Sequence, residues 1–204
     1  MSANLMGNVE GAAAGELARK AEEVGFHSIW AVEHAVVPLE YASTYPYDDG
    51  GRLFKGASQL DHSDPLIWLA FAAAATTKIR LATGILILPQ RNPLIAAKEI
   101  ASLDRLSDGR LDLGIGVGWL REEFEALGVP FEARGARTDE YLRALKVLWS
   151  ETEAEFHGNF VDFAPVYCQP KPTQQPIPIL VGGHSDRAAQ RAGELGDVFF
   201  PAER

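Results

Sequence analysis

The chain has 204 residues, of which 47% are apolar, enough for one domain with a sizeable hydrophobic core. Its formal net charge of −9 and the lack of any Lys/Arg cluster argue against nucleic acid as a partner. No apolar stretch approaches the roughly 20 residues that span a bilayer, so we expect no membrane partner. The single cysteine, Cys168, excludes a disulfide framework within the chain and a cysteine-rich metal site, and with the lack of a signal-peptide pattern it favours a cytoplasmic protein.

Helix signals recur along the whole chain. Apolar residues at helical spacing begin at Ala14, and Gly25 stands where a left-handed residue ends a helix. Asp64-Pro65 and Asn92-Pro93 each join an N-cap residue to a proline at the first helical position, so two more helices are expected to start there. In chain order the predicted helices cover residues 14–24, 65–76, 93–106, 119–127, 134–149 and 185–195.

Short apolar strands alternate with these helices. They are apolar on both faces, which is typical of a parallel sheet covered by helices. This pattern fits an open doubly wound sheet and a closed barrel equally well. A small hairpin is expected to turn at Gly158-Asn159. The predicted strands cover residues 26–32, 79–83, 111–115, 177–181 and 198–200.

The segment 33–64 is long, rich in Tyr, Pro, Gly and Asp, and predicted to be a loop. Loops of this length are usually functional or disordered. We expect it to cover the pocket. Its aromatic residues suggest an apolar or planar substrate, and they are Tyr41, Tyr45, Tyr47 and Phe54.

Four predicted strands end in unusual residues, and ligands bind at the carboxyl ends of parallel strands. These endings are Glu33-His34, Thr83-Gly84, Gly114 to Gly118, and Gly182-Gly183-His184-Ser185. We therefore expect all four to face one pocket.

The Gly182-Gly183 pair before a helix start is a candidate anion site, because glycines admit a phosphate close to the backbone and a helix start offers free N–H groups. We expect the backbone N–H groups of both glycines to face solvent or a bound anion. An ordinary turn capped by Ser185 explains the same residues. Gly114, Gly116 and Gly118 do not match the dinucleotide-binding pattern, since no glycine stands at the required third position.

His34 could transfer a proton or hydrogen-bond a cofactor ring, because histidine titrates near neutral pH. A histidine that caps the strand is the simpler reading of spacing alone. No His, Glu or Asp repeats at zinc-ligand spacing, so no metal site is expected. The chain has no G-x-S-x-G motif, and nucleophilic hydrolysis is not supported.

Taken together, the motifs of residues 14–201 resemble the luciferase-like monooxygenases. Within that superfamily the tyrosine-rich YPYDDG at 45–50 is similar to the probable coenzyme F-420-dependent oxidoreductases. The motifs that carry the resemblance are AEEVGFHSIW at 21–30, EH at 33–34, RLATGI at 80–85, PQRNP at 89–93, LDRLSDGRL at 103–111, GIGVGWLREEF at 114–124 and PILVGGHS at 178–185.

This resemblance implies a (β/α)₈ TIM barrel and an enzyme that transfers hydride between coenzyme F-420 and a small organic substrate. An FMN-dependent monooxygenase using oxygen is an alternative, and a non-catalytic remnant is another. The resemblance places His34 beside the redox ring as the catalytic residue. It implies that Thr83-Gly84-Ile85 forms a bulge behind the ring, often with a non-prolyl cis peptide. Gly116 and Gly118 would line the pocket, and Gly182-Gly183-His184 with Ser185 would hold the phosphate tail.

The chain departs from the family pattern at both ends. Residues 1–11 contain no apolar run that could form the first strand, and the chain stops soon after the sixth strand. We therefore expect residues 1–204 to form one incomplete barrel domain that lacks the first strand and the last two strand–helix units. A homo-oligomer, most simply a dimer, is expected, because an open barrel exposes strand edges.

Overall fold

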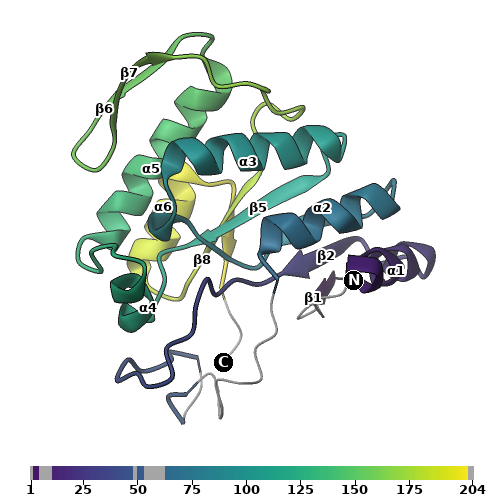
Figure 1. Ribbon diagram of the computed structural model, residues 1–204, viewed down its shortest axis with the longest axis horizontal. Coiled ribbons are helices and arrows are strands. Elements are labelled where there is room, and N and C mark those ends of the chain that lie inside the picture. Colours follow the sequence, from purple (N-terminus) through teal and green to yellow (C-terminus); the bar gives the residue numbers. More distant parts are fainter. Residues whose placement is uncertain (1, 5–10, 48–49, 53–62, 202–204) are drawn as a thin grey trace.

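The computed structural model describes residues 2–4, 11–47, 50–52 and 63–201, in which helices and parallel strands alternate (Figure 1). The caps expected from sequence are present: Asp64 accepts the amides of Leu66 and Ile67, and Asn92 accepts those of Leu94 and Ile95. The helices are α1 (Gly11–Glu23), α2 (Pro65–Ala75), the 3-10 helix η2 (Leu88–Gln90), α3 (Pro93–Leu106), α4 (Arg121–Ala126), α5 (Arg134–Ser150) and α6 (Asp186–Leu195).

Seven parallel strands form the main sheet, in the order β1-β2-β3-β5-β8-β9, with the short β4 beside β5. The strands are β1 (Ser2–Asn4), β2 (Ser28–Ala31), β3 (Arg80–Thr83), β4 (Leu86–Ile87), β5 (Leu111–Gly116), β8 (Ile179–Gly182) and β9 (Val198–Phe200). A doubly wound sheet reverses its strand order partway across, whereas this order follows the chain without reversal, as in a barrel. The parallel α/β prediction is confirmed, and so is the separate antiparallel hairpin of β6 (Ala154–His157) and β7 (Asp162–Val166).

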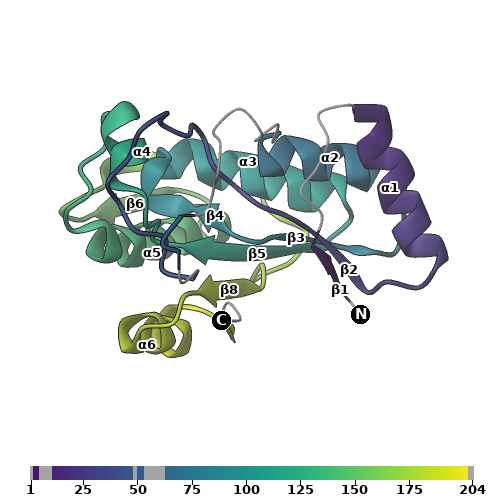
Figure 2. The same cartoon turned by 90° about the horizontal axis from the view of Figure 1, so that it is seen from below.

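The sheet is strongly curled. The rings of Trp30 in β2 and Phe200 in β9 stack with centroids 4.8 Å apart. In a flat sheet four strand spacings would separate these two strands by roughly 19 Å. Figure 2 shows α1, α2 and α3 along one side of the strands and α6 on the opposite side, beyond β8. The fold is therefore the curved wall of a (β/α)₈-type barrel.

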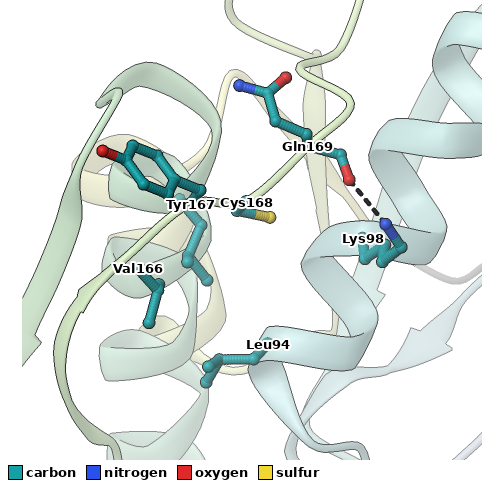
Figure 3. Close-up of a pocket in the computed structure, with 7 residues that line it drawn as sticks. Leu94, Lys98, Val166, Tyr167, Cys168 and Gln169 are labelled. Carbon is teal, nitrogen blue, oxygen red and sulfur yellow. Dashed lines mark hydrogen bonds between the residues drawn. The ribbon is translucent and has the colours of Figure 1, made fainter.

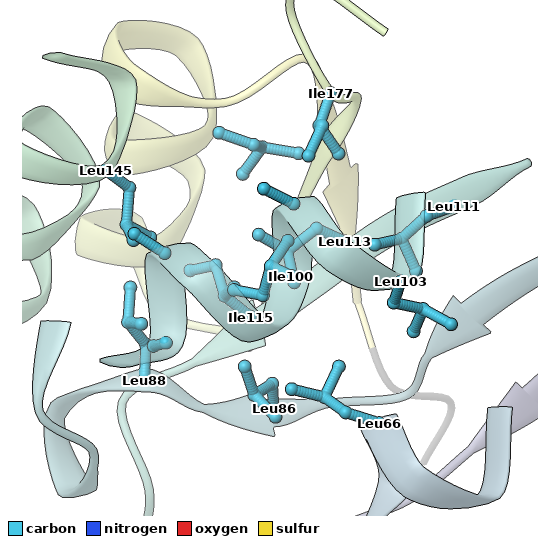
Figure 4. Packing of buried hydrophobic residues seen from close by; sticks show 14 of the residues in the cluster. Leu66, Leu86, Leu88, Ile100, Leu103, Leu111, Leu113, Ile115, Leu145 and Ile177 are labelled. Carbon is cyan, nitrogen blue, oxygen red and sulfur yellow. The ribbon is translucent and has the colours of Figure 1, made fainter. Parts of the chain in front are cut away.

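The hydrophobic core lies between the outer face of this wall and the helices. Leu111, Leu113 and Ile115 of β5 alternate with residues of the inner face and are fully buried, together with Ile100 of α3 (Figure 4). Each fully buried Leu or Ile stabilises the fold by about 1.5–3 kcal/mol relative to an exposed one. This packing fixes the strands, and with them the positions of the residues that follow each strand.

One sequence prediction of the fold is wrong. A first strand was not expected in residues 1–11, yet Ser2–Asn4 pair in parallel with Ser28–Trp30. Parallel pairing uses only backbone groups, so a three-residue strand at a sheet edge needs no apolar run. The strand β4 and the 3-10 helix η2 were also not predicted, because the run 84–91 is too short to show a period.

Candidate active site

The residues predicted to carry chemistry lie at one edge of the sheet. His34 follows β2, Gly84 follows β3, Gly116 ends β5 and Gly182 ends β8. All four strands run parallel, so their carboxyl ends share an edge. The structure thus brings the four endings to one edge of the sheet, and that they face one pocket stays a prediction.

His34 is held by a buried glutamate that sequence reasoning did not single out. Its Nδ1 atom lies 3.0 Å from Oε2 of Glu123, whose side chain has no exposed surface. The other oxygen, Oε1, accepts the backbone N–H groups of Ala35 (2.7 Å) and Val36 (3.3 Å). Glu123 therefore fixes both the imidazole ring and the start of the long loop.

An unbroken series of aromatic rings leads from His34 to His184. The edge of Trp119 lies against His34, with centroids 6.1 Å apart, and its ring also contacts Tyr45 at 5.1 Å. Tyr45 contacts Tyr47 at 5.3 Å, and Tyr47 contacts His184 at 4.9 Å. The loop after β2 thus spans the whole edge, from the end of β2 to the end of β8.

Tyr41 belongs to the same cluster. Its ring lies 5.9 Å from that of Trp119, and the guanidinium of Arg52 lies 4.6 Å from its centroid. Its hydroxyl is buried, and within the part of the chain that the structure describes it has no hydrogen-bond partner. A buried hydroxyl of this kind normally bonds to water or a ligand. Three other residues of the predicted loop motifs, Phe54 and the pair Asp48-Asp49, lie outside the described residues.

The bulge predicted after β3 is present. β3 ends at Thr83, β4 begins at Leu86, and the peptide bond between Gly84 and Ile85 is cis. The Thr83 hydroxyl donates to the carbonyl of Gly114 at 2.6 Å. This bond ties the end of β3 to β5.

Glycines of β5 and β8 make room for the bulge. A Cβ atom on Gly182 would lie 1.9 Å from Cδ1 of Ile85, and one on Gly116 would lie 3.1 Å from the same atom. A Cβ atom on Gly114 would lie 2.0 Å from the carbonyl oxygen of Thr83. Packing against the bulge thus explains these glycines without a ligand. The predicted roles of Gly116 as a pocket-lining residue and of Gly182 in holding a phosphate tail stay predictions.

A largely buried ion network fixes β4, the strand that follows the bulge. Glu33, at the end of β2, accepts the backbone N–H of Ile87 and pairs with Arg91, which also bonds to Asp64 at 2.5 Å. Burial raises the pKa of Glu33, against the opposing effects of Arg91 and the Ile87 amide. Since Asp64 also caps α2, one network joins β2, β4 and the start of α2.

The candidate anion site at the end of β8 is partly as predicted. Ser185 caps α6, and its Oγ accepts the Ala188 amide at 3.2 Å. Gly183 has a φ of +134°, a conformation that only glycine adopts readily. However, the prediction that the Gly183 N–H faces solvent or an anion is wrong, because β9 supplies an acceptor, the carbonyl of Phe200, at 3.3 Å. Because Ser185 takes the Ala188 amide, the amides that remain for an anion are those of Asp186 and Arg187 at the start of α6.

Sequence reasoning assigned no role to Glu123, Trp119 or Arg91, and it named Glu33 only as part of a strand ending. Glu122 and Glu123 occupy the first turn of a six-residue helix, where acidic residues ordinarily serve the helix dipole. Glu122 instead accepts the amides of Ala42 and Ser43 (2.7 and 3.1 Å). These pairings span about 80 residues of sequence, so no local pattern could reveal them.

A hollow on the outer surface lies elsewhere, between α3 and the segment that follows β7 (Figure 3). It contains Cys168, which is buried, and the Lys98 ammonium donates to the Gln169 carbonyl at 2.7 Å. The described residues include no group of three or more His, Cys, Asp or Glu side chains placed to hold a metal ion. Among the helices of the described residues, none is both long and apolar enough to cross a membrane.

The chain is similar to several known proteins. The chain is 39% identical over 165 residues to an uncharacterized protein of Mycobacterium tuberculosis (strain ATCC 25618 / H37Rv), a match that covers 81% of this chain and 58% of that protein. It is 33% identical over 189 residues to the FMNH(2)-dependent dimethylsulfone monooxygenase of Pseudomonas putida, covering 91% of this chain and 47% of the relative.

Among solved structures, an F-420-dependent secondary alcohol dehydrogenase in complex with an F-420–acetone adduct superimposes with a TM-score of 0.75 at 25% identity, covering 98% of this chain and 56% of that one. The chain thus spans about half the length of the relatives it matches. The family model described as luciferase-like monooxygenase matches residues 3–203. The chain belongs to the luciferase-like monooxygenase family.

Proposed function

We propose that this chain carries the cofactor site of an oxidoreductase that transfers hydride between coenzyme F-420 and a small organic substrate. The observation that carries the proposal is the braced imidazole of His34, placed at the same sheet edge as the bulge Thr83-Gly84-Ile85. Coenzyme F-420 supplies the hydride chemistry when bound, and the protein supplies orientation and electrostatics.

The residues present fit such a group. His34 would hold or move a proton beside the redox ring, and Thr83, Gly84 and Ile85 would support the ring from behind. The buried Tyr41 hydroxyl, which lacks a partner among the described residues, is suited to a polar group of a bound molecule. Gly116 and Gly118 would line the pocket at the end of β5.

The phosphate-bearing tail would lie at the start of α6. Gly182 and Gly183 allow a close approach of the backbone, and the Ser185 cap takes only the Ala188 amide, which leaves those of Asp186 and Arg187 for the tail. His184, which is exposed and lies against Tyr47, would add a donor. The aromatic loop between the two ends favours an apolar or planar substrate.

A reduced-FMN-dependent monooxygenase is the second candidate. The 33% identity to a dimethylsulfone monooxygenase favours it, because that relative's name states its use of FMNH(2). Both cofactors combine a tricyclic ring with a phosphate-bearing tail, so the same residues serve either one.

A binding titration with purified chain separates the candidates. We expect coenzyme F-420 to bind with a change in its fluorescence, and FMN to bind more weakly. The reverse order supports the monooxygenase. A folded chain that binds neither cofactor refutes both and leaves the non-catalytic remnant.

The partner is proposed to be a second copy of this chain, docked on the outer face of α2. This helix is apolar on every side, and Ile67 (61% exposed) and Phe71 (53%) lie one turn apart on its outer face. A helix that is apolar all round is normally buried. The double variant Ile67→Glu, Phe71→Glu should shift a dimer to monomer in sedimentation velocity. The control Leu39→Glu changes an even more exposed apolar residue in the loop (88%), and an equal shift there would refute the interface.

A further inference from the structure

We propose that Glu123 is a positioning residue that keeps the proton of the His34 ring on Nδ1, so that Nε2 is the ring nitrogen able to accept a proton. The inference deepens the proposed function, on which its catalytic meaning rests. The hydrogen-bond geometry that carries it does not depend on which cofactor binds.

The hydrogen-bonding capacity of each group decides which atom donates. A carboxylate has only acceptor oxygens, and a neutral imidazole has one donor and one acceptor nitrogen. The Nδ1 atom of His34 lies 3.0 Å from Oε2 of Glu123, a hydrogen-bond distance. With an acceptor on the glutamate side, Nδ1 must be the donor.

The second oxygen of Glu123 fixes which way the carboxylate is turned. Oε1 accepts two backbone N–H groups, those of Ala35 and Val36. A backbone N–H cannot exchange the roles of donor and acceptor, so Oε1 must remain an acceptor. The Glu123 side chain is fully buried, and these three bonds therefore decide its orientation without help from solvent.

The helix that carries Glu123 is itself fixed. Phe124, the next residue, is fully buried, and its ring packs on that of Phe131 with centroids 5.3 Å apart. The amide of Glu123 donates to the carbonyl of Leu120 at 3.2 Å. The carboxylate is thus presented to His34 from a rigid support, as positioning groups require.

Glu123→Gln should move the proton of the neutral His34 ring from Nδ1 to Nε2 without changing the shape of the site. A glutamine has one acceptor oxygen and one donor nitrogen. The Ala35 and Val36 amides need the oxygen, so the side-chain NH₂ must face Nδ1 of His34. Nδ1 then becomes an acceptor, and the neutral ring carries its proton on Nε2.

The neighbouring glutamate offers a matched control. Glu122 lies in the same turn of α4, and its Oε1 also accepts two loop amides, those of Ala42 and Ser43. Glu122→Gln keeps an oxygen for these amides and leaves the His34 bond untouched. It therefore makes the same chemical change without the predicted change in tautomer.

The test is ¹⁵N NMR of the histidine rings in the full chain, without cofactor, with the His34 signals assigned as those lost in His34→Asn. In the wild-type protein and in Glu122→Gln we expect a proton on Nδ1. In Glu123→Gln we expect the proton on Nε2 only. A wild-type ring without a proton on Nδ1 overturns the proposal whether or not any variant folds, and so does an unchanged tautomer in a folded Glu123→Gln.

Turnover supplies a separate readout. Where a histidine is held in the wrong tautomer in a catalytic triad, kcat falls about 10⁴-fold, and we expect Glu123→Gln to lose roughly 10²–10⁴-fold in kcat with little change in cofactor affinity. If the chain binds no cofactor but the NMR result holds, the proposed function fails and the tautomer assignment stands. If cofactor binds and His34→Ala loses turnover while Glu123→Gln does not, the positioning role of Glu123 is refuted and the proposed function stands.

Discussion

The contact between the bulge and β8 predicts a strong, specific coupling between Gly182 and Ile85. In Gly182→Ala the new methyl group would lie 1.9 Å from Cδ1 of Ile85, far inside van der Waals contact. Overpacking of this kind costs about 1–3 kcal/mol in the free energy of unfolding. For an m-value of about 2 kcal/mol/M, a loss of 2 kcal/mol lowers the urea midpoint by about 1 M.

Ile85→Val should relieve the clash because it removes Cδ1. The nearest atom to the new methyl group is then Cγ1, at 3.2 Å, which small shifts can accommodate. Ile85→Val alone should cost about 0.5–1.5 kcal/mol. In its background, Gly182→Ala should cost less than about 1 kcal/mol, and the double-mutant cycle should show coupling of at least about 1 kcal/mol.

The assay is urea unfolding followed by circular dichroism for the four members of the cycle. Gly193→Ala is the control, since a Cβ atom there meets nothing within 4 Å, and in the last turn of α6 it should be neutral or stabilise by up to about 1 kcal/mol. If Gly182→Ala lowers the free energy of unfolding equally in the wild-type protein and in Ile85→Val, the proposed packing is refuted. The glycine would then be required for some other reason.

Three further predictions concern the site and the hairpin. His34→Ala should lower kcat by about 10²–10⁴-fold and change cofactor affinity much less, and equal losses in both would indicate a structural histidine. Gly183→Val should weaken binding of FMN or coenzyme F-420 more than that of riboflavin or the bare deazaflavin, since the change lies beside the tail site; equal weakening contradicts the anion site. Burial alone would raise the pKa of Glu140, but the amides of Phe160, Val161 and Asn159 outweigh it and hold the pKa below its ordinary value of 4.5. A lowered folded-state pKa stabilises the protein above that pH and the effect is lost as the pH falls, so the free energies of unfolding of wild type and Glu140→Gln should converge in acid, and a constant difference would contradict this.

Much of the fold could be predicted because its signals are local. Asp64-Pro65 and Asn92-Pro93 fix two helix starts through caps that involve only the next three residues. The strand positions followed from short apolar runs. The barrel-like order could not be derived from periodicity, since it depends on how the strands pair, and the family resemblance supplied it.

The candidate site was predictable only in part for the same reason. The position of His34 at a strand end is a local fact, and the structure confirms its place beside the other strand ends. Its partner, Glu123, stands 89 residues further along the chain, in a helix whose acidic first turn has an ordinary explanation. The Gly183 amide was wrongly expected to be available because its acceptor comes from β9.

The two adjacent glutamates of α4 also divide the long loop into parts that can vary independently. Glu123 holds the backbone at Ala35 and Val36, and Glu122 holds it at Ala42 and Ser43. Residues 37–41 are thus a short closed segment between two fixed points. Lengthening such a segment costs little entropy, only about 0.6 kcal/mol for each doubling in length. An engineer who wishes to change the substrate could insert residues there and leave both anchors, and the imidazole beside them, in place.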